Sequence, residues 1–404
     1  MAAPIVTEHR VEPPLESLVP GYWLERDGVR LYVGETVLEL NHRHGAHTLG
    51  ELRTASAVPW PGVFFAGGRP FDLSNALFLD TETTGLGRGP GTFCFMVGIG
   101  HVEQDRLVVR QYMAPDYGHE SLLLRVVAEQ AARSSGLVTF NGRGFDLPIL
   151  ETRYILNGYE HSPLQGLPHL DLLPAARRLW GRALPSCALG ALESGLLDVV
   201  RSGEDIPGYL IPGIYADYLS RGATEEMARV FYHNCMDVLS MVTLAAEAAD
   251  ALAPRQGFEL TSRRDPVALG RIREADNARD LAAEAYRAGL AAHDDRTRGE
   301  SRRRLAALLK RTGQIHQAAT LWIEALEEGT LYPYIELAKY YEHTTRDYRE
   351  AELLVRRAML ALASGAIVDS RPVDALEQLA RRLARLQRRL QNQRRHDNTT
   401  SAVA

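Results

Sequence analysis

The chain has 404 residues, of which 45% are hydrophobic and 24% charged, and its formal net charge is −5. This composition is typical of a globular protein of two or three domains, and it excludes a disordered chain and a strongly basic one. No apolar run reaches the roughly 18 residues of a membrane span, and the N-terminus lacks the basic start and apolar core of a secretory signal. We therefore expect a cytoplasmic protein without a membrane partner.

Residues 1–72 contain short alternating stretches such as VRLYVGETVLEL, interrupted by Pro and Gly, which is the pattern of β-strands. We interpret this region as a small β-rich N-terminal arm. The stretch NHRHGAHTLG brings His42, His44 and His47 close together in sequence, but no Cys or carboxylate stands beside them at metal-ligand spacing. We expect a solvated loop there.

Residues 73–254 form a second region, in which strands come first and then alternate with helices. Three strand-like runs are followed by a helix, a strand, a helix and finally a long helix, at 76–80, 93–103, 106–114, 121–133, 136–140, 146–158 and 229–252. This order predicts an α/β domain with a mixed sheet.

The stretch LFLDTETTGL places two acidic residues at the end of a strand that reads as buried. Asp80 and Glu82 are two positions apart, so their side chains point to the same face of the strand. Buried carboxylates this close repel each other, and a bound cation is the simplest compensation. The sequence therefore predicts a cation site at the C-terminal end of this strand, where α/β sheets place ligands.

Further acidic residues fall where they can complete this site. Asp146, in FNGRGFDLPILETR, follows a second strand and begins a helix, where a carboxylate also stabilises the helix N-terminus. His233 and Asp237, in YHNCMD, are four positions apart on one face of the long helix. Four carboxylates form an oxygen-rich site that favours Mg²⁺ or Mn²⁺ over zinc. Two such ions, held about 3.5–4 Å apart, suit attack on a phosphodiester.

The stretches FLDTETTGL, FNGRGFDLPILETR and HNCMD resemble the three motifs of the DEDD exonuclease superfamily. With HLDLLPAARRLW and CALGALE between the second and third motifs, residues 75–253 most resemble a YprB-type RNase H-like exonuclease domain. The resemblance implies a five-stranded mixed sheet flanked by helices. It also implies 3′→5′ hydrolysis of DNA or RNA, at single-stranded ends, with two divalent ions, Mg²⁺ or Mn²⁺.

The resemblance also implies a role for each residue of the site. Asp80 would bridge both ions, Glu82 and Asp237 would hold the catalytic ion, and Asp146 would support the second. His233 would position or deprotonate the attacking water.

The third motif departs from the family pattern. The family has Tyr with three residues before the Asp or His with four, whereas here His233 has the three-residue spacing and Tyr232 the four-residue spacing. Helical geometry favours His233, with Tyr232 in a packing role. Thr81 and Asn141 are candidate substrate contacts, although Asn141 can equally serve only to make the turn. For Asp171 we expect the N-cap of the next helix.

Residues 265–395 carry a repeated helical pattern. The stretch AAEAYRAGL at 282–290 aligns with AATLWIEAL at 318–326, an offset of 36. This period resembles tetratricopeptide repeats of about 34 residues, so we expect an all-α solenoid that binds a protein partner or extends the substrate surface. If the nuclease site is weak, the alternative is a scaffold that acts through these repeats.

A leucine-rich helix follows the repeats, and we expect it to cap the solenoid. Its other face carries five arginines, which indicate either a solvated face or a contact with nucleic acid or a partner: Arg381, Arg382, Arg385, Arg388 and Arg389. We expect residues 396–404 to be a disordered tail.

Overall fold

A computed structural model describes residues 12–66, 71–85, 87, 89–253, 264–368 and 370–401. The described residues fall into two compact units, one up to Ala253 together with Arg264, and the other from Asp265 onward. The domain boundary predicted at 254–265 falls almost entirely outside the described residues. No helix in the described part of the chain is long and apolar enough to cross a membrane.

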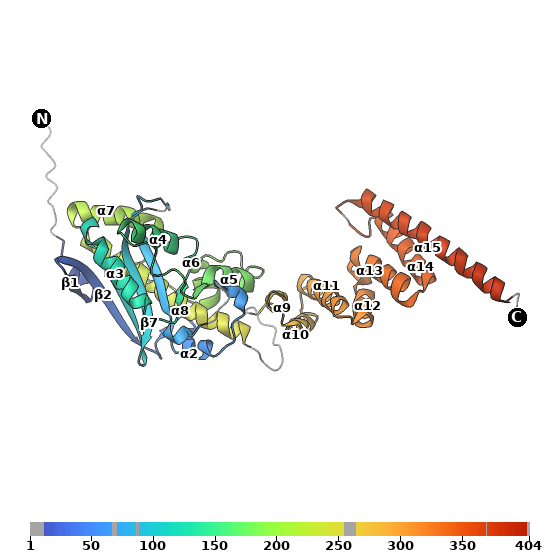
Figure 1. Cartoon of the computed structure of the whole chain (residues 1–404), viewed down its shortest axis with the longest axis horizontal. Helices are drawn as coiled ribbons and strands as arrows, with labels where there is room; N and C mark the ends of the chain where they lie inside the picture. The colour runs from blue at the N-terminus through green and yellow to red at the C-terminus, as the bar shows by residue number, and fades with distance from the viewer. Residues whose placement is uncertain are drawn as a thin grey trace, which may run out of the picture. The chain divides into compact units, whose positions relative to one another are not determined.

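The first unit is built on an eight-stranded mixed sheet in the order β1-β2-β8-β7-β6-β9-β10-β5. Figure 1 labels β1, β2 and β7 of this sheet. Strands β6, β9 and β10 are parallel and all other neighbours are antiparallel. The prediction of five strands was wrong, because β1, β2 and the short β5 extend the central five. The strands are β1 Gly21–Arg26, β2 Val29–Glu39, β5 Phe65–Ala66, β6 Leu77–Thr83, β7 Cys94–Glu103, β8 Arg106–Met113, β9 Leu137–Thr139 and β10 His169–Asp171.

The β-rich N-terminal region is part of this sheet and not a separate arm. Strand β2 pairs with β8 from Tyr32–Met113 to Glu39–Arg106. The pairing covers an edge of β8 that would otherwise expose unpaired backbone groups. Asp27 and Gly28 both have positive φ and join β1 to β2 in a tight hairpin turn.

The histidine-rich stretch forms a small hairpin, β3 Arg43–His44 and β4 His47–Thr48. His44 and His47 are buried, so the predicted solvated loop was wrong at these two positions. The reason is that both rings have polar partners in neighbouring helices: His44 Nε2 lies 2.8 Å from Ser240 Oγ, and His47 Nδ1 lies 2.7 Å from Glu51 Oε2. Burial lowers the pKa of His44 to about 4, so this ring is neutral.

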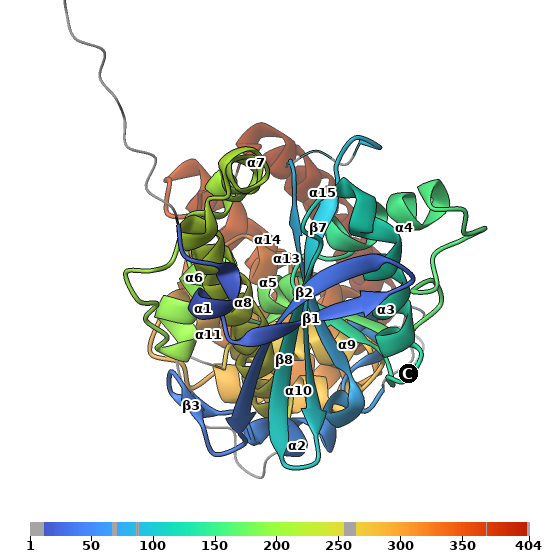
Figure 2. The same cartoon turned by 90° about the vertical axis from the view of Figure 1, so that its left-hand side faces the viewer.

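Helices cover both faces of the sheet, with α8 on one side and α3 and α4 on the other (Figure 2). Gly98 and Gly100 of β7 allow α8 to approach closely, since a Cβ at either position would lie within 2.5 Å of an α8 side chain. The helices of this unit are α1 Leu15–Leu18, α2 Glu51–Ser56, α3 Glu120–Ala131, α4 Asp146–Leu156, α5 Leu172–Trp180, α6 Leu189–Leu192, α7 Ile211–Arg221 and α8 Thr224–Leu252.

The second unit is helical throughout its described part, in which successive helices pack on one another (Figure 1). Small alanines with no exposed surface line these contacts, among them Ala282, Ala306 and Ala351. The helical character agrees with the predicted pattern, while the tetratricopeptide-like repeat stays a prediction. The helices are α9 Pro266–Ala275, α10 Arg279–Gly289, α11 Asp295–Arg311, α12 Ile315–Glu324, α13 Tyr332–Tyr340, α14 Tyr348–Ala363 and α15 Pro372–Ser401.

The arginine face of α15 is partly engaged within the protein. Glu342, which is 1% exposed, accepts hydrogen bonds from Arg382 Nη1 and Arg385 Nε, each at 2.7 Å, and Arg389 Nη1 lies 3.7 Å from it. The predicted alternatives, a solvated face or an external contact, did not include this internal ion-pair cluster, although Arg385 and Arg389 remain partly exposed beside Glu342. Helix α15 also continues to Ser401, into the predicted tail 396–404, because no Pro or Gly interrupts it; residues 402–404 lie outside the described part.

Candidate active site

Strand β6 carries the first two acidic residues of the candidate site. Its first three residues, Leu77–Leu79, are buried between β7 and β9, and the strand then reaches Asp80 and Glu82. On the neighbouring strand β7, Asp80 lies opposite Gly98 and Glu82 opposite Met96. Directly after Glu82 the pairing becomes irregular, so both carboxylates come just before the sheet opens.

Asn234 of α8 holds Asp80 in place. Its side-chain amide donates a 2.8 Å hydrogen bond to Asp80 Oδ2, and its oxygen accepts a 3.1 Å bond from Gln111 Nε2. A Cβ on Gly98 would lie 2.0 Å from this oxygen, so only glycine leaves room for the contact. Asn234 was not among the predicted site residues, although its position between His233 and Asp237 in the third motif was a usable signal.

Asp146 is the first residue of α4 and is almost fully buried. Its Oδ1 accepts hydrogen bonds from the Thr81 amide at 3.2 Å and the Thr81 hydroxyl at 2.5 Å. Thr81, the predicted substrate contact, therefore contacts Asp146 in this structure and ties α4 to β6.

Asn141 lies in the loop between β9 and α4, where its φ is +66°. Its backbone amide donates a 2.8 Å hydrogen bond to Asp171 Oδ1, and the same oxygen accepts a 3.1 Å bond from the Leu173 amide. Asp171 is thus the N-cap of α5, as predicted. The backbone of Asn141 serves the turn, and the substrate role of its side chain stays a prediction.

His233 and Asp237 lie one turn apart on α8, with His233 Nε2 3.6 Å from Asp237 Oδ2. The other ring nitrogen, Nδ1, lies 2.8 Å from Asp205 Oδ1. Tyr232 points elsewhere, because its hydroxyl accepts a 2.9 Å hydrogen bond from the Ser202 amide. The structure therefore brings His233, and not Tyr232, to the acidic residues.

Arg201 is a further residue of the site that was not predicted from sequence. Its guanidinium donates two hydrogen bonds to buried Glu193, at 2.5 and 2.8 Å, and a further one to Asp237 Oδ1. It also lies 3.4 Å from Asp205 Oδ1. Arg201 stands in an irregular loop with no strand or helix pattern, so only the fold reveals that it faces the acids.

The four predicted carboxylates interact electrostatically. Burial, followed by repulsion from Asp237, Glu82 and Asp146, raises the pKa of Asp80 well above its usual range. Burial and repulsion from Asp237 and Asp146 do the same for the pKa of Glu82. Each acid thus disfavours ionisation of its neighbours, and a bound cation would relieve this repulsion.

Burial also raises the pKa of the other two acids, although each has partners that oppose the shift. The pKa of Asp146 rises to about 6, against the hydrogen bonds from Thr81. The pKa of Asp237 is raised despite the nearby positive charge of Arg201 and the His233 ring. Arg201 therefore compensates the cluster only in part.

The chemistry of this donor set fits a hard divalent cation, since its ligands are carboxylate oxygens. In the described part of the chain, however, no three His, Cys, Asp or Glu side chains are arranged to hold one ion. Asp237 Oδ1 is bonded to Arg201, and Asp146 Oδ1 to Thr81. The residues fit a metal by charge and donor type, and ion binding would require side chains to turn.

Comparison with known proteins places these residues in a family context. The model of the RNase H superfamily matches residues 77–249, which contain all five candidate catalytic residues. The uncharacterized protein YprB of Bacillus subtilis (strain 168) is 30% identical over 370 residues, covering 88% of this chain and 86% of YprB. This similarity extends over both units of the chain.

Proposed function

Since the chain belongs to the family of YprB and carries an RNase H superfamily domain, we propose that it is a metal-dependent 3′→5′ exonuclease. Its substrate would be the single-stranded end of DNA or RNA. The observation that carries this proposal is the cluster of four acidic residues from β6, α4 and α8, whose pKa values are all raised. Such a cluster is suited to bind cations at a phosphodiester.

We assign the metal-ligand role to Asp80, Glu82, Asp146 and Asp237. Two Mg²⁺ or Mn²⁺ ions bound there would activate water and stabilise the leaving oxygen of an in-line displacement. Asn234 supports this role, because its amide fixes one oxygen of Asp80 and leaves the other available. Thr81 orients Asp146 in the same way through its hydroxyl.

The proposed general base is His233. Asp205 accepts a hydrogen bond from Nδ1, which orients the ring and leaves Nε2 on the side of Asp237 as the proton acceptor. A base in this position would take the proton of the attacking water. Asn141 is retained as a candidate substrate contact through its side-chain amide.

The contact between Arg201 and Asp237 supports a second candidate function, that of a catalytically weak scaffold. Its guanidinium holds Asp237 Oδ1 where a metal ligand would be needed. For the nuclease, Asp237 must exchange this contact for an ion, and the released guanidinium can then contact the substrate phosphate. For the scaffold, the contact would be permanent and the helical unit would carry the function.

Trimming of end-labelled oligonucleotides tests these alternatives. We expect the wild-type chain to shorten 5′-labelled DNA or RNA stepwise from the 3′ end in Mn²⁺, and to stop in chelator. The Asp80→Asn, Glu82→Gln variant, which preserves side-chain size, should be inactive. A wild type that trims no substrate with either ion would exclude the nuclease and favour the scaffold.

A further inference from the structure

Four arginines surround a cavity of about 470 Å³ in the helical unit. Arg271 comes from α9, Arg279 from the start of α10, and Arg304 and Arg311 from α11. Glu274 is the one carboxylate among the residues that line this cavity. We call these four arginines the arginine pocket.

Two of these arginines are neutralised within the protein. Arg311 forms an ion pair with Glu274, and Arg304 Nε lies 2.6 Å from Glu300 Oε1. Arg271 and Arg279 are exposed, and neither forms an ion pair or side-chain hydrogen bond with any described residue. The arginine pocket therefore presents two free guanidinium groups beside two paired ones, a positive charge that an anionic ligand would compensate.

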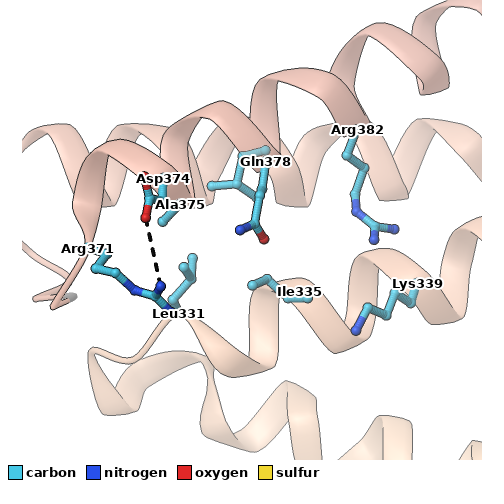
Figure 3. A pocket seen from close by; sticks show the side chains of 9 residues that line it. Leu331, Ile335, Lys339, Arg371, Asp374, Ala375, Gln378 and Arg382 are labelled. Atoms are coloured by element: carbon cyan, nitrogen blue, oxygen red, sulfur yellow. Dashed lines mark ion pairs between the residues drawn. The ribbon is translucent and has the colours of Figure 1, made fainter.

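A second cavity in the same unit gives a useful contrast (Figure 3). It measures about 300 Å³ between α13 and α15, and Lys339, Arg371 and Arg382 line it. Each of these cations has a carboxylate partner: Lys339 pairs with Glu336 at 2.6 Å, Arg382 with Glu342 at 2.7 Å, and Arg371 with Asp374 at 4.0 Å. Of these pairs, Arg382–Glu342 joins α15 to another part of the unit, and the other two are local. Each positive charge already has a partner, so this cavity calls for no external anion.

We propose that the arginine pocket binds phosphate groups of a single-stranded nucleic acid. Planar guanidinium groups match phosphate oxygens in bidentate geometry, which makes Arg the favoured residue for such contacts. Among the described residues of the lining, Ala275 and Leu308 are the only apolar ones and none is aromatic, so the pocket offers neither the apolar anchors of a protein interface nor a platform for base stacking. Recognition here would therefore be of charge alone, as in contacts to a phosphate backbone. Several classes of ligand carry phosphate groups. We choose nucleic acid among them because it is the substrate of the proposed function, on which this inference rests.

Fluorescence anisotropy with the full chain tests this inference. A fluorescein-labelled oligomer of about 20 nucleotides, as single-stranded DNA and as RNA, is titrated in chelator so that no hydrolysis intervenes. Each lost phosphate contact lowers the slope of log affinity against log salt by about 0.7 for a single strand. We expect the Arg271→Gln, Arg279→Gln variant to lose about 1.4 from this slope and to bind about 25-fold more weakly at 0.1 M salt.

The matched control is Arg349→Gln, Arg357→Gln, which removes the same charge from two exposed arginines of α14 that also form no ion pair with described residues. We expect it to retain wild-type affinity. Equal weakening by both variants, or no nucleic-acid binding by the wild type, would overturn the inference. Tight binding of a labelled polyglutamate peptide, lost in the pocket variant, would assign the pocket to acidic proteins and overturn it as well.

The binding result is separable from the activity result. A wild type that trims oligonucleotides but binds them independently of Arg271 and Arg279 contradicts the pocket alone. A wild type that binds through these arginines but never trims contradicts the exonuclease alone. Circular dichroism of each variant verifies that the helical unit is intact.

Discussion

His233 and Tyr232 are neighbours in sequence but face different surroundings. His233 lies between Asp205 and Asp237, whereas the Tyr232 hydroxyl is bonded to the backbone of Ser202. The i to i+4 spacing predicted from sequence that His233 lies beside Asp237, because this proximity follows from helical geometry alone. It offered no information on Asp205 or Ser202, since both belong to a loop whose path depends on the whole fold.

The base assignment predicts different results for the two residues. His233→Ala should lower the turnover number by about 10²–10⁴-fold while Mn²⁺ binding is retained, because it removes a proton acceptor and no ligand. Tyr232→Phe should keep most activity, because the one hydrogen bond of its hydroxyl to a described residue comes from the Ser202 backbone amide. Single-turnover kinetics on a labelled oligonucleotide measure both. Full activity in His233→Ala would reassign the base to Tyr232 or to water alone.

The raised pKa of Asp146 predicts how stability depends on pH in the metal-free protein. The folded-state pKa of about 6 exceeds the value of 3.8 for a free carboxyl group, so the native state holds the proton more tightly than the unfolded state. Protonation of Asp146 therefore contributes to the free energy of unfolding. This contribution is fully present below about pH 4 and is lost as pH rises through about 6.

The matched variant for this prediction is Asp146→Asn, whose amide does not titrate. In chelator, wild type should lose of the order of 2 kcal/mol relative to Asp146→Asn between pH 4 and 7. Urea denaturation at a series of pH values measures the difference. Parallel pH profiles for the two proteins would show that Asp146 titrates normally.

At the scale of elements, the contact between β7 and α8 determines where the site forms. A buried apolar strand that ends in two acids and a long amphipathic helix were both recognisable in the sequence. The pairing of β2 with β8 could not be recognised in the sequence, because the paired residues are distant from each other along the chain. Asn234 and Arg201 could not be predicted for the same reason, because their roles also depend on contacts distant in sequence. These contacts form only when α8 and the loop before α7 pack near β6.

Substitution of Gly98 tests the contact between β7 and α8 directly. Gly98→Ala would place a Cβ 2.0 Å from Asn234 Oδ1 and displace the amide that holds Asp80. We expect a loss of about 1–3 kcal/mol in the free energy of unfolding, and reduced activity even where the protein is fully folded. Gly213→Ala on α7 is the matched control, since its Cβ would meet no atom within 4 Å. Wild-type activity in Gly98→Ala would contradict the role of Asn234.

At the scale of the whole molecule, the chain combines a mixed-sheet unit with a helical unit. The α/β order and the helical character of the second unit were evident from sequence because both depend on local periodicity. The charge arrangement in the helical unit could not be read from sequence, since nothing distinguishes the five arginines on one face of α15 from one another. In the structure, three of its arginines surround Glu342, while Arg271 and Arg279 of other helices have no partner among the described residues.

Glu342 is predicted to fasten α15 to the helical unit. Burial alone would raise its pKa, but the hydrogen bond from Arg385 and the charges of Arg385, Arg382 and His343 together outweigh burial, so the pKa is lowered. Ionised Glu342 therefore stabilises the folded helical unit at pH values above the ordinary glutamate pKa. This contribution is lost as the pH falls through the lowered pKa of Glu342. Glu342→Gln should destabilise the unit by about 2–3 kcal/mol at neutral pH, measured by urea denaturation or by hydrogen exchange in α15.

Glu377→Gln provides the control for this prediction. Glu377 pairs with Arg381 on the exposed surface of α15, at 3.1 Å, so its removal should change stability by less than about 1 kcal/mol. Equal effects of the two substitutions would mean that burial of Glu342 adds nothing to the attachment of α15.

The central claim is that Asp80, Glu82, Asp146 and Asp237 form a site for divalent cations. Calorimetric titration of Mn²⁺ into the full chain, compared with the Asp80→Asn, Glu82→Gln variant, tests it most directly. We expect two ions per wild-type chain and loss of this binding in the variant, with both proteins folded. Absence of Mn²⁺ binding by the wild type, or equal binding by the two proteins, would contradict it.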